Sequence, residues 1–136
     1  MHPVPKQISD IGIVPVIAID DAEKAVPLAK ALVAGGLPVA EVTFRTAAGE
    51  AAIRAISREV PEMLVGAGTV LTHDQLDRAL DAGARFIVSP GFNPDMVRYG
   101  LSKGALMVPG TATPGEMEQA MALGLEVVKF FPAEQN

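Results

Sequence analysis

The feature that most constrains the fold of this 136-residue chain is a regular alternation of short apolar runs with longer amphipathic segments. The units repeat at roughly 20 to 25 residues, a spacing that fits one strand followed by one helix. The apolar runs are rich in β-branched residues and are mostly apolar at successive positions, as strands covered on both faces of a parallel sheet require. The expected strands are residues 13–18, 39–44, 63–66, 85–89, 105–108 and 126–130.

Five amphipathic segments between these runs are expected to be helices. Asp20 or Asp21 can cap the first of them, and Thr72 and Thr113 stand where two later ones would be capped. Gly83 stands where a helix would end, because glycine adopts positive φ without a steric penalty. The expected helices are residues 22–34, 49–59, 74–81, 94–101 and 114–123.

Two architectures fit this order of elements, a closed (β/α)8 barrel of the TIM type and an open doubly wound sheet. An open dinucleotide-binding sheet normally carries a Gly-x-Gly-x-x-Gly turn after its first strand, whereas Ile19-Asp20-Asp21 follows it here. Polar residues also gather where the strands end, which is where barrel enzymes place their chemistry. We therefore expect a single α/β barrel domain over residues 1–136, with about six of the eight βα units.

The number of units leads to a further expectation. A full barrel of this type needs about 200 residues or more, so the chain is expected to be a truncated, split or engineered form. Its open sheet edges would then be covered by another copy or another chain, or the fold would be only partly formed.

Composition excludes several classes of protein. The net charge is −5, and the basic residues are scattered rather than gathered for a nucleic acid. No apolar run is long enough to cross a bilayer, and the first ten residues lack the apolar region of a signal peptide, so a cytoplasmic protein is expected. Cysteine is absent, which excludes disulfides and thiolate nucleophiles. His2 and His73 belong to no cluster that would bind a metal, and both are expected to face solvent.

Lys129 is the candidate nucleophile. It lies between Val127-Val128 and Phe130-Phe131, in the most apolar stretch of the chain. Apolar surroundings favour the uncharged amine, which can attack a ketone and form a Schiff base that serves as an electron sink. The alternative is a lysine whose stem covers apolar surface at a strand end while its ammonium group stays in water.

Glu41 and Arg45 lie on the second expected strand and at its end. A carboxylate in a segment otherwise built for the interior can carry protons beside Lys129. The planar guanidinium of Arg45 matches the carboxylate of a 2-keto acid. The alternatives are a Glu41–Arg45 ion pair at the strand end, or an Arg45 that is solvated or pairs with Glu50. Gly66-Ala67-Gly68-Thr69 is expected to form a tight turn that contributes to a small anion site.

Seven short motifs occur in an order and spacing that resemble the 2-keto-3-deoxy-6-phosphogluconate and 4-hydroxy-2-oxoglutarate aldolase family. The resemblance runs from about the first expected strand to the last residue. The motifs are Val14-Pro15-Val16, Ala34-Gly35-Gly36, Glu41-Val42-Thr43-Phe44-Arg45-Thr46, Gly66-Ala67-Gly68-Thr69-Val70, Ser89-Pro90-Gly91, Pro109-Gly110 and Val128-Lys129-Phe130-Phe131-Pro132-Ala133-Glu134.

The resemblance implies a homotrimeric (β/α)8 barrel of the Entner–Doudoroff pathway. Such a lyase cleaves 2-keto-3-deoxy-6-phosphogluconate to pyruvate and glyceraldehyde 3-phosphate, and in some members 4-hydroxy-2-oxoglutarate to pyruvate and glyoxylate, with no metal or cofactor. By the same resemblance, Lys129 corresponds to the Schiff-base lysine and Glu41 to the general acid and base.

The remaining site residues are also implied by the resemblance. Arg45 and Thr69 match residues near the pyruvate carboxylate, and Pro90 and Phe131 match apolar walls of the pocket. The family builds its phosphate site largely from loops after the seventh and eighth strands, so phosphate anchoring is not expected to survive in this chain.

Two other interpretations remain open from the sequence. One is an inactive aldolase-derived fragment or assembly module, in which open sheet edges drive association. The other is a different phosphate-handling barrel, similar to a thiamine phosphate synthase, which accounts for the βα order but not for the pairing of Glu41 with Lys129.

Overall fold

Six parallel strands form one sheet in the computed structural model, which describes residues 3–135. The strands lie in their order along the chain, and each pairs in parallel with the next. This order never reverses, which excludes the doubly wound sheet and confirms the expected partial (β/α)8 barrel. The strands are β1 (Val16–Ile17), β2 (Val39–Thr43), β3 (Leu64–Gly68), β4 (Ile87–Ser89), β5 (Met107–Thr111) and β6 (Lys129–Phe130).

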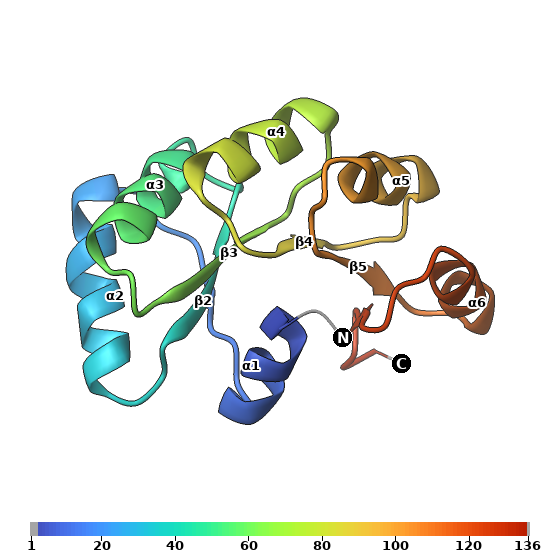
Figure 1. The fold of residues 1–136 in the computed structure, drawn as a ribbon, viewed down its shortest axis with the longest axis horizontal. Coiled ribbons are helices and arrows are strands. Elements are labelled where there is room, and N and C mark those ends of the chain that lie inside the picture. Colours follow the sequence, from blue (N-terminus) through green and yellow to red (C-terminus); the bar gives the residue numbers. More distant parts are fainter. Residues whose placement is uncertain (1–2, 136) are drawn as a thin grey trace.

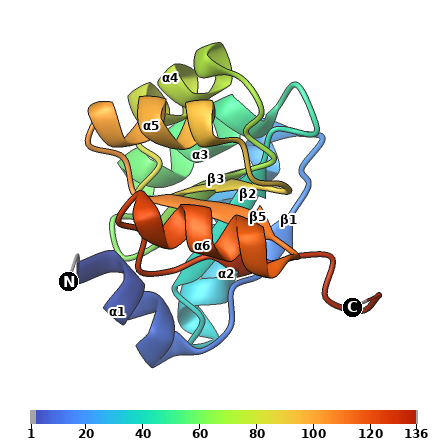
Figure 2. The same cartoon turned by 90° about the vertical axis from the view of Figure 1, so that its right-hand side faces the viewer.

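Helices cover the two faces of the curved sheet unequally. Figure 1 shows α2 to α6 along its outer side, with α1 on the inner side, and Figure 2 shows α1 across the sheet from α3, α4 and α5. None of the helices described within residues 3–135 is long and apolar enough to span a membrane. The helices are α1 (Pro3–Ile11), the 3₁₀ turn η1 (Ala22–Lys24), α2 (Ala25–Ala34), α3 (Gly49–Glu59), α4 (His73–Ala82), α5 (Pro94–Ser102) and α6 (Pro114–Ala122).

The caps expected at Thr72, Gly83 and Thr113 are confirmed, whereas Asp21 caps the 3₁₀ turn η1 and α2 has no side-chain cap. Thr72 Oγ1 accepts the backbone N–H of Gln75 at 3.1 Å at the start of α4, and Gly83 ends that helix with a φ of 105°. At the start of α6, Thr113 and Glu116 form a capping box, in which each side chain accepts the backbone N–H of the other residue. These caps satisfy N–H groups that have no partner inside the helix.

The edge strands are shorter than expected. β1 has 2 residues instead of residues 13–18, and β6 has 2 instead of 126–130. Pro15 has no N–H to donate to a ladder, and each edge strand has a neighbour on one side only. In contrast, β3 and β5 extend to Gly68 and Thr111, beyond their expected ends.

Two apolar clusters pack against the sheet. The outer cluster lies between the sheet and the helices and includes Ile53, Leu76 and Ile87, all at most 1% exposed. The inner cluster joins α1 to the opposite face of the sheet, and Val4 of α1 is fully buried there. The rest of the inner cluster is formed by Val39, Leu64, Phe86 and Val88.

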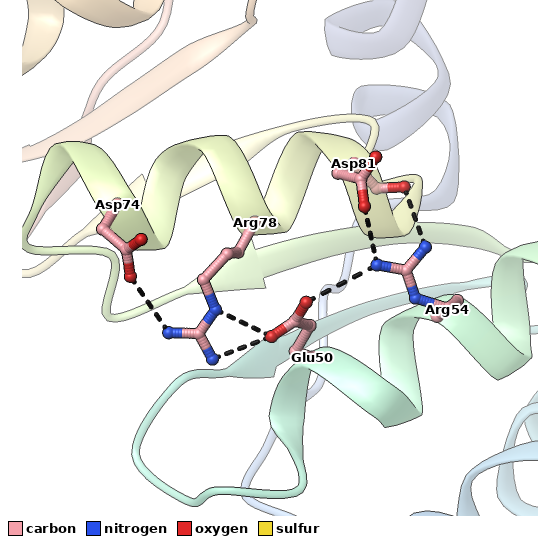
Figure 3. A network of polar contacts seen from close by, with 5 residues as sticks. All are labelled: Glu50, Arg54, Asp74, Arg78 and Asp81. Carbon is pink, nitrogen blue, oxygen red and sulfur yellow. Dashed lines mark hydrogen bonds and ion pairs between the residues drawn. The ribbon is translucent and has the colours of Figure 1, made fainter.

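Charged side chains join α3 to α4 on the outer surface (Figure 3). The Glu50 carboxylate accepts from Arg78 at 2.8 Å and lies 3.5 Å from Arg54. Arg54 also pairs with Asp81 at 2.8 Å, and Arg78 with Asp74 at 3.2 Å. Because each arginine bridges two carboxylates, the network holds neighbouring βα units together on the side away from the inner face.

Candidate active site

Glu41 and Lys129 line one cavity of about 260 Å³ on the inner face of the sheet. Glu41 comes from β2 and is 6% exposed, while Lys129 opens β6. The other lining residues are apolar and come from α1, the strands and the segments beside them; they are Ile8, Val14, Val16, Phe86, Val88, Val108 and Val127. The cavity thus contains one amine and one carboxylate within otherwise apolar walls.

Burial is the main influence on the ionisation of Glu41. Loss of water around the carboxylate raises the pKa of Glu41 above 4.5, and the positive charges of Lys129 and Arg45 oppose the rise in part. Neither cation forms an ion pair with Glu41 among the described residues, so both act through space. A carboxyl group whose pKa is raised keeps its proton to higher pH and can both donate and accept it.

The raised pKa predicts how stability depends on pH. A carboxyl whose pKa is higher in the folded state binds its proton more tightly there, so its stabilising contribution is complete below pH 4.5 and is lost as pH rises through the folded pKa. We expect Glu41→Gln to match the parent in free energy of unfolding at pH 4. The variant should become relatively more stable at higher pH, by about 1.4 kcal/mol per unit of pKa difference. Urea unfolding of both proteins from pH 4 to 8 measures this, and a variant that loses relative stability with rising pH contradicts it.

Lys129 is less enclosed than its sequence neighbours suggest. Its residue is half-buried, and its Nζ lies 4.5 Å from the centre of the Phe131 ring. The flanking side chains of Val127 and Phe130 are 41% and 47% exposed. The fully apolar surroundings expected from the sequence are therefore not formed around Lys129, because β6 has a neighbour, β5, on one side only.

Arg45 is exposed in the turn after β2. The alternative in which it pairs with Glu50 is wrong, because the Glu50 carboxylate is occupied by Arg54 and Arg78. The positive charge of Arg45 acts on Glu41 and lowers the pKa of its carboxyl, although Arg45 does not line the cavity. Arg45 can therefore attract an anion toward the cavity.

The other three expected site residues lie at the C-terminal ends of the strands. Thr69 follows β3 with a φ of 56°, a conformation that is costly for a β-branched residue and that must be imposed by its surroundings. Pro90 lines a different cavity of about 300 Å³, together with Ser89 and Asn93. Phe131 is 39% exposed and contacts Lys129 through its ring. Phe131 thus contacts Lys129, but Arg45, Thr69, Pro90 and Phe131 are all absent from the lining of the Glu41–Lys129 cavity.

Gly66 and Gly68 have a different role from the one expected. They lie inside β3 rather than in a tight anion-binding turn. A Cβ atom on Gly66 would collide with the ring of Phe86, and one on Gly68 would collide with the carboxyl group of Glu41. The two glycines therefore leave the space that these two side chains fill.

Thr43 is a functional candidate to which the sequence analysis assigned no role of its own. It is fully buried at the end of β2, and its Oγ1 has no hydrogen-bond partner in the described part of the chain. The sequence feature that could have identified it is the alternation of side chains along a strand, which places Thr43 on the same face as Glu41. No group of three potential metal ligands occurs among residues 3–135.

The chain is similar to aldolases in sequence and in structure. The model of the family described as KDPG and KHG aldolase matches residues 4–136. A 2-dehydro-3-deoxy-phosphogluconate aldolase of Treponema pallidum is 50% identical over 124 residues, which are 91% of this chain and 59% of the relative. This chain therefore spans less than two thirds of the length of that relative.

Two solved structures resemble this fold over most of the chain. The 2-keto-3-deoxy-6-phosphogluconate aldolase of Zymomonas mobilis, solved with 3-phosphoglycerate, superposes with a TM-score of 0.87 at 43% identity, covering 96% of this chain and 64% of that one. The KDPG aldolase of Legionella pneumophila, with pyruvate captured as a covalent carbinolamine, gives 0.86 at 40% identity, covering 90% and 59%.

Proposed function

Because the chain belongs to the KDPG and KHG aldolase family, we propose that it binds a 2-keto acid as a Schiff base on Lys129 and that Glu41 carries the protons. The observation that supports this most directly is the cavity shared by the two side chains. An amine alone on an exposed strand end would have no proton carrier, and a buried carboxylate alone would have no nucleophile. Because Glu41 of β2 and Lys129 of β6 line the same cavity, one bound molecule can reach both the nucleophile and the proton carrier.

The chemistry needs one group that changes its protonation state. The Lys129 amine attacks the keto carbon, and the keto oxygen leaves as water after it has taken one proton from the amine and one from Glu41 in its acid form. The resulting iminium withdraws electrons from the bond between the α and β carbons of the keto acid. Glu41 as carboxylate then takes the proton of the hydroxyl group on the departing aldehyde, and the bond breaks to leave an enamine of pyruvate on Lys129.

Further features support a keto acid as the ligand. Arg45, exposed in the turn after β2, offers a planar cation to the carboxylate next to the keto group. Phe131 forms an apolar contact at Lys129. Thr69 and Pro90 are proposed to complete the binding site from the neighbouring strand ends. We propose 2-keto-3-deoxy-6-phosphogluconate as the substrate, and 4-hydroxy-2-oxoglutarate as a second one.

Pyruvate and sodium borohydride test the proposal. The hydride reduces an imine to a stable amine, so intact mass should increase by one reduced pyruvate, and peptide mapping should place it on Lys129. Lactate in place of pyruvate is the matched control, because it carries the same carboxylate without a keto group. A folded sample that gains no mass with pyruvate contradicts the proposal.

One observation favours a second candidate, an assembly module. Large apolar side chains are exposed along the two edge strands, including Val16 at 50% and Phe130 at 47%. Surfaces of this kind associate with other chains. Native mass spectrometry combined with the pyruvate experiment separates the candidates, because oligomers without an adduct support the module and an adduct supports the enzyme. Trimeric assembly and a cytoplasmic location stay predictions from the sequence.

A further inference from the structure

The side chain of Thr43 presents an unusual feature inside the sheet. It is 0% exposed, and its hydroxyl has no hydrogen-bond partner in the described part of the chain. A buried hydroxyl without a partner is unfavourable, because it has given up its hydrogen bonds to water without replacement. Valine has nearly the same shape and would carry no such penalty, so the hydroxyl at this position calls for a functional explanation.

The alternation of β2 places this hydroxyl on the same face as Glu41. Val39 belongs to the inner cluster, while Ala40 and Val42 belong to the outer one. Glu41 and Thr43 therefore both face inward, as every second residue of a strand does. Thr43 is the next inward-facing residue after Glu41, toward the C-terminal end of the strand.

Gly68 brings the two polar groups together. It is the cross-strand partner of Thr43 on β3. The carboxyl group of Glu41 occupies the place where a side chain of Gly68 would begin. Neighbouring strands lie about 4.7–4.9 Å apart, so the carboxyl of Glu41 and the Thr43 side chain both lie next to Gly68, on the same face of the sheet. The hydroxyl of a threonine can change direction by rotation about its Cα–Cβ bond.

We propose that Thr43 is a positioning residue that donates a hydrogen bond to the Glu41 carboxylate whenever Glu41 is ionised. The charged groups that act on Glu41 are Lys129 from β6 and Arg45 from the turn after β2, and neither pairs with it directly. The remaining lining of the cavity is apolar. Thr43 is therefore the neutral donor available to hold the carboxylate in one orientation after it has lost its proton.

This inference rests on the proposed function, in which Glu41 alternates between acid and carboxylate. A donor that bonds only the ionised form stabilises that form and limits how far burial raises the pKa of Glu41. It also keeps the carboxylate from turning away between the two proton transfers. Catalytic hydrogen bonds are often unformed in a free enzyme and tighten when the reacting state appears.

Two substitutions separate the hydroxyl from its methyl group. Thr43→Val keeps the shape and removes the hydroxyl, whereas Thr43→Ser keeps the hydroxyl and removes the methyl group. The titration of the Glu41 side-chain carboxyl, followed by carbon-13 NMR in the parent and both variants, measures the interaction. We expect the midpoint of Glu41 to rise by roughly one pH unit in Thr43→Val and to stay near the parent value in Thr43→Ser.

Thermal unfolding provides the second readout. At a pH where Glu41 is protonated, Thr43→Val should have a melting temperature equal to or above that of the parent, because it removes a buried hydroxyl without a partner. Thr43→Ser should melt lower, because it leaves a small cavity. Thr43→Val is thus expected to shift the titration of Glu41 without lowering the melting temperature. A purely structural role of Thr43 would not produce this combination.

Two results in these variants would overturn the role proposed for Thr43. It fails if Thr43→Val leaves the Glu41 midpoint unchanged, or if Thr43→Ser moves it as far as Thr43→Val. The pH dependence of the pyruvate adduct, measured beside the titration, should shift with the Glu41 midpoint. If the parent forms no adduct, the proposed function fails, while the titration still decides the role of Thr43.

Discussion

Lys129→Met is expected to reduce the pyruvate adduct trapped by borohydride to background, a loss on the order of 100-fold or more, because the variant has no amine in the cavity. Methionine keeps an unbranched stem of similar length, so the half-buried position beside Phe131 stays filled. The circular dichroism spectrum and the unfolding midpoint should remain close to those of the parent. Intact mass after trapping gives the adduct yield directly.

Lys103→Met is the matched control for this variant. Lys103 is also a partly exposed lysine, but it lies after α5, where it pairs with Asp77 at 3.8 Å. Its removal should leave the adduct yield unchanged. Equal yields in the parent and in Lys129→Met would show that pyruvate reacts at another amine, and the assignment of the nucleophile would then be wrong.

Gly68→Ala is expected to impair both stability and chemistry. The added Cβ would occupy the place of the Glu41 carboxyl group. Gly68 lies in a strand paired on both sides, so the backbone cannot easily move away. Overpacking of this kind costs about 1–3 kcal/mol of the free energy of unfolding. Displacing a catalytic group by about 1 Å can lower a rate roughly 100-fold, and we expect adduct formation to slow by one to two orders of magnitude.

Gly115→Ala tests whether the effect is specific to the site. Gly115 lies in the first turn of α6, and a Cβ there would meet no atom within 4 Å. Its free energy of unfolding should equal or slightly exceed that of the parent, since alanine is the better helix former. Urea unfolding and the rate of trapping, measured on both variants, give the comparison. If Gly68→Ala had the same stability and trapping rate as Gly115→Ala, the position of the Glu41 carboxyl would not depend on the absence of a side chain at Gly68.

Local patterns in the sequence were sufficient to predict most of the secondary structure. The helix expected at residues 49–59 has those bounds in α3, and α5 and α6 differ from their expected ranges by one residue each. α5 and α6 carry their own capping residues, Asn93 and Thr113, and α3 has a strongly amphipathic pattern. By contrast, α1 was not expected, because Pro3 and Pro5 obscured a helical pattern whose stability comes from burial of Val4 against the sheet.

The candidate site was predictable to the extent that it follows from strand direction. Parallel strands bring their C-terminal ends to one edge, so Glu41 and Lys129 could be placed together from their positions in β2 and β6. The degree of burial of Lys129 could not be predicted, since it depends on which strands flank β6. The separate cavity at Pro90 could not be predicted either, because packing sets the arrangement of side chains between neighbouring strand ends.

The position of α1 has a consequence for how the chain is made. This helix of 9 residues is too short to be stable alone in water, and its partners in the inner cluster extend to Val88. During synthesis this helix is made before the strands, yet the surface on which it docks includes residues of β4 and β5. The helix is therefore made before the strands but gains a fixed place after them, and Ile8 then completes the lining of the cavity.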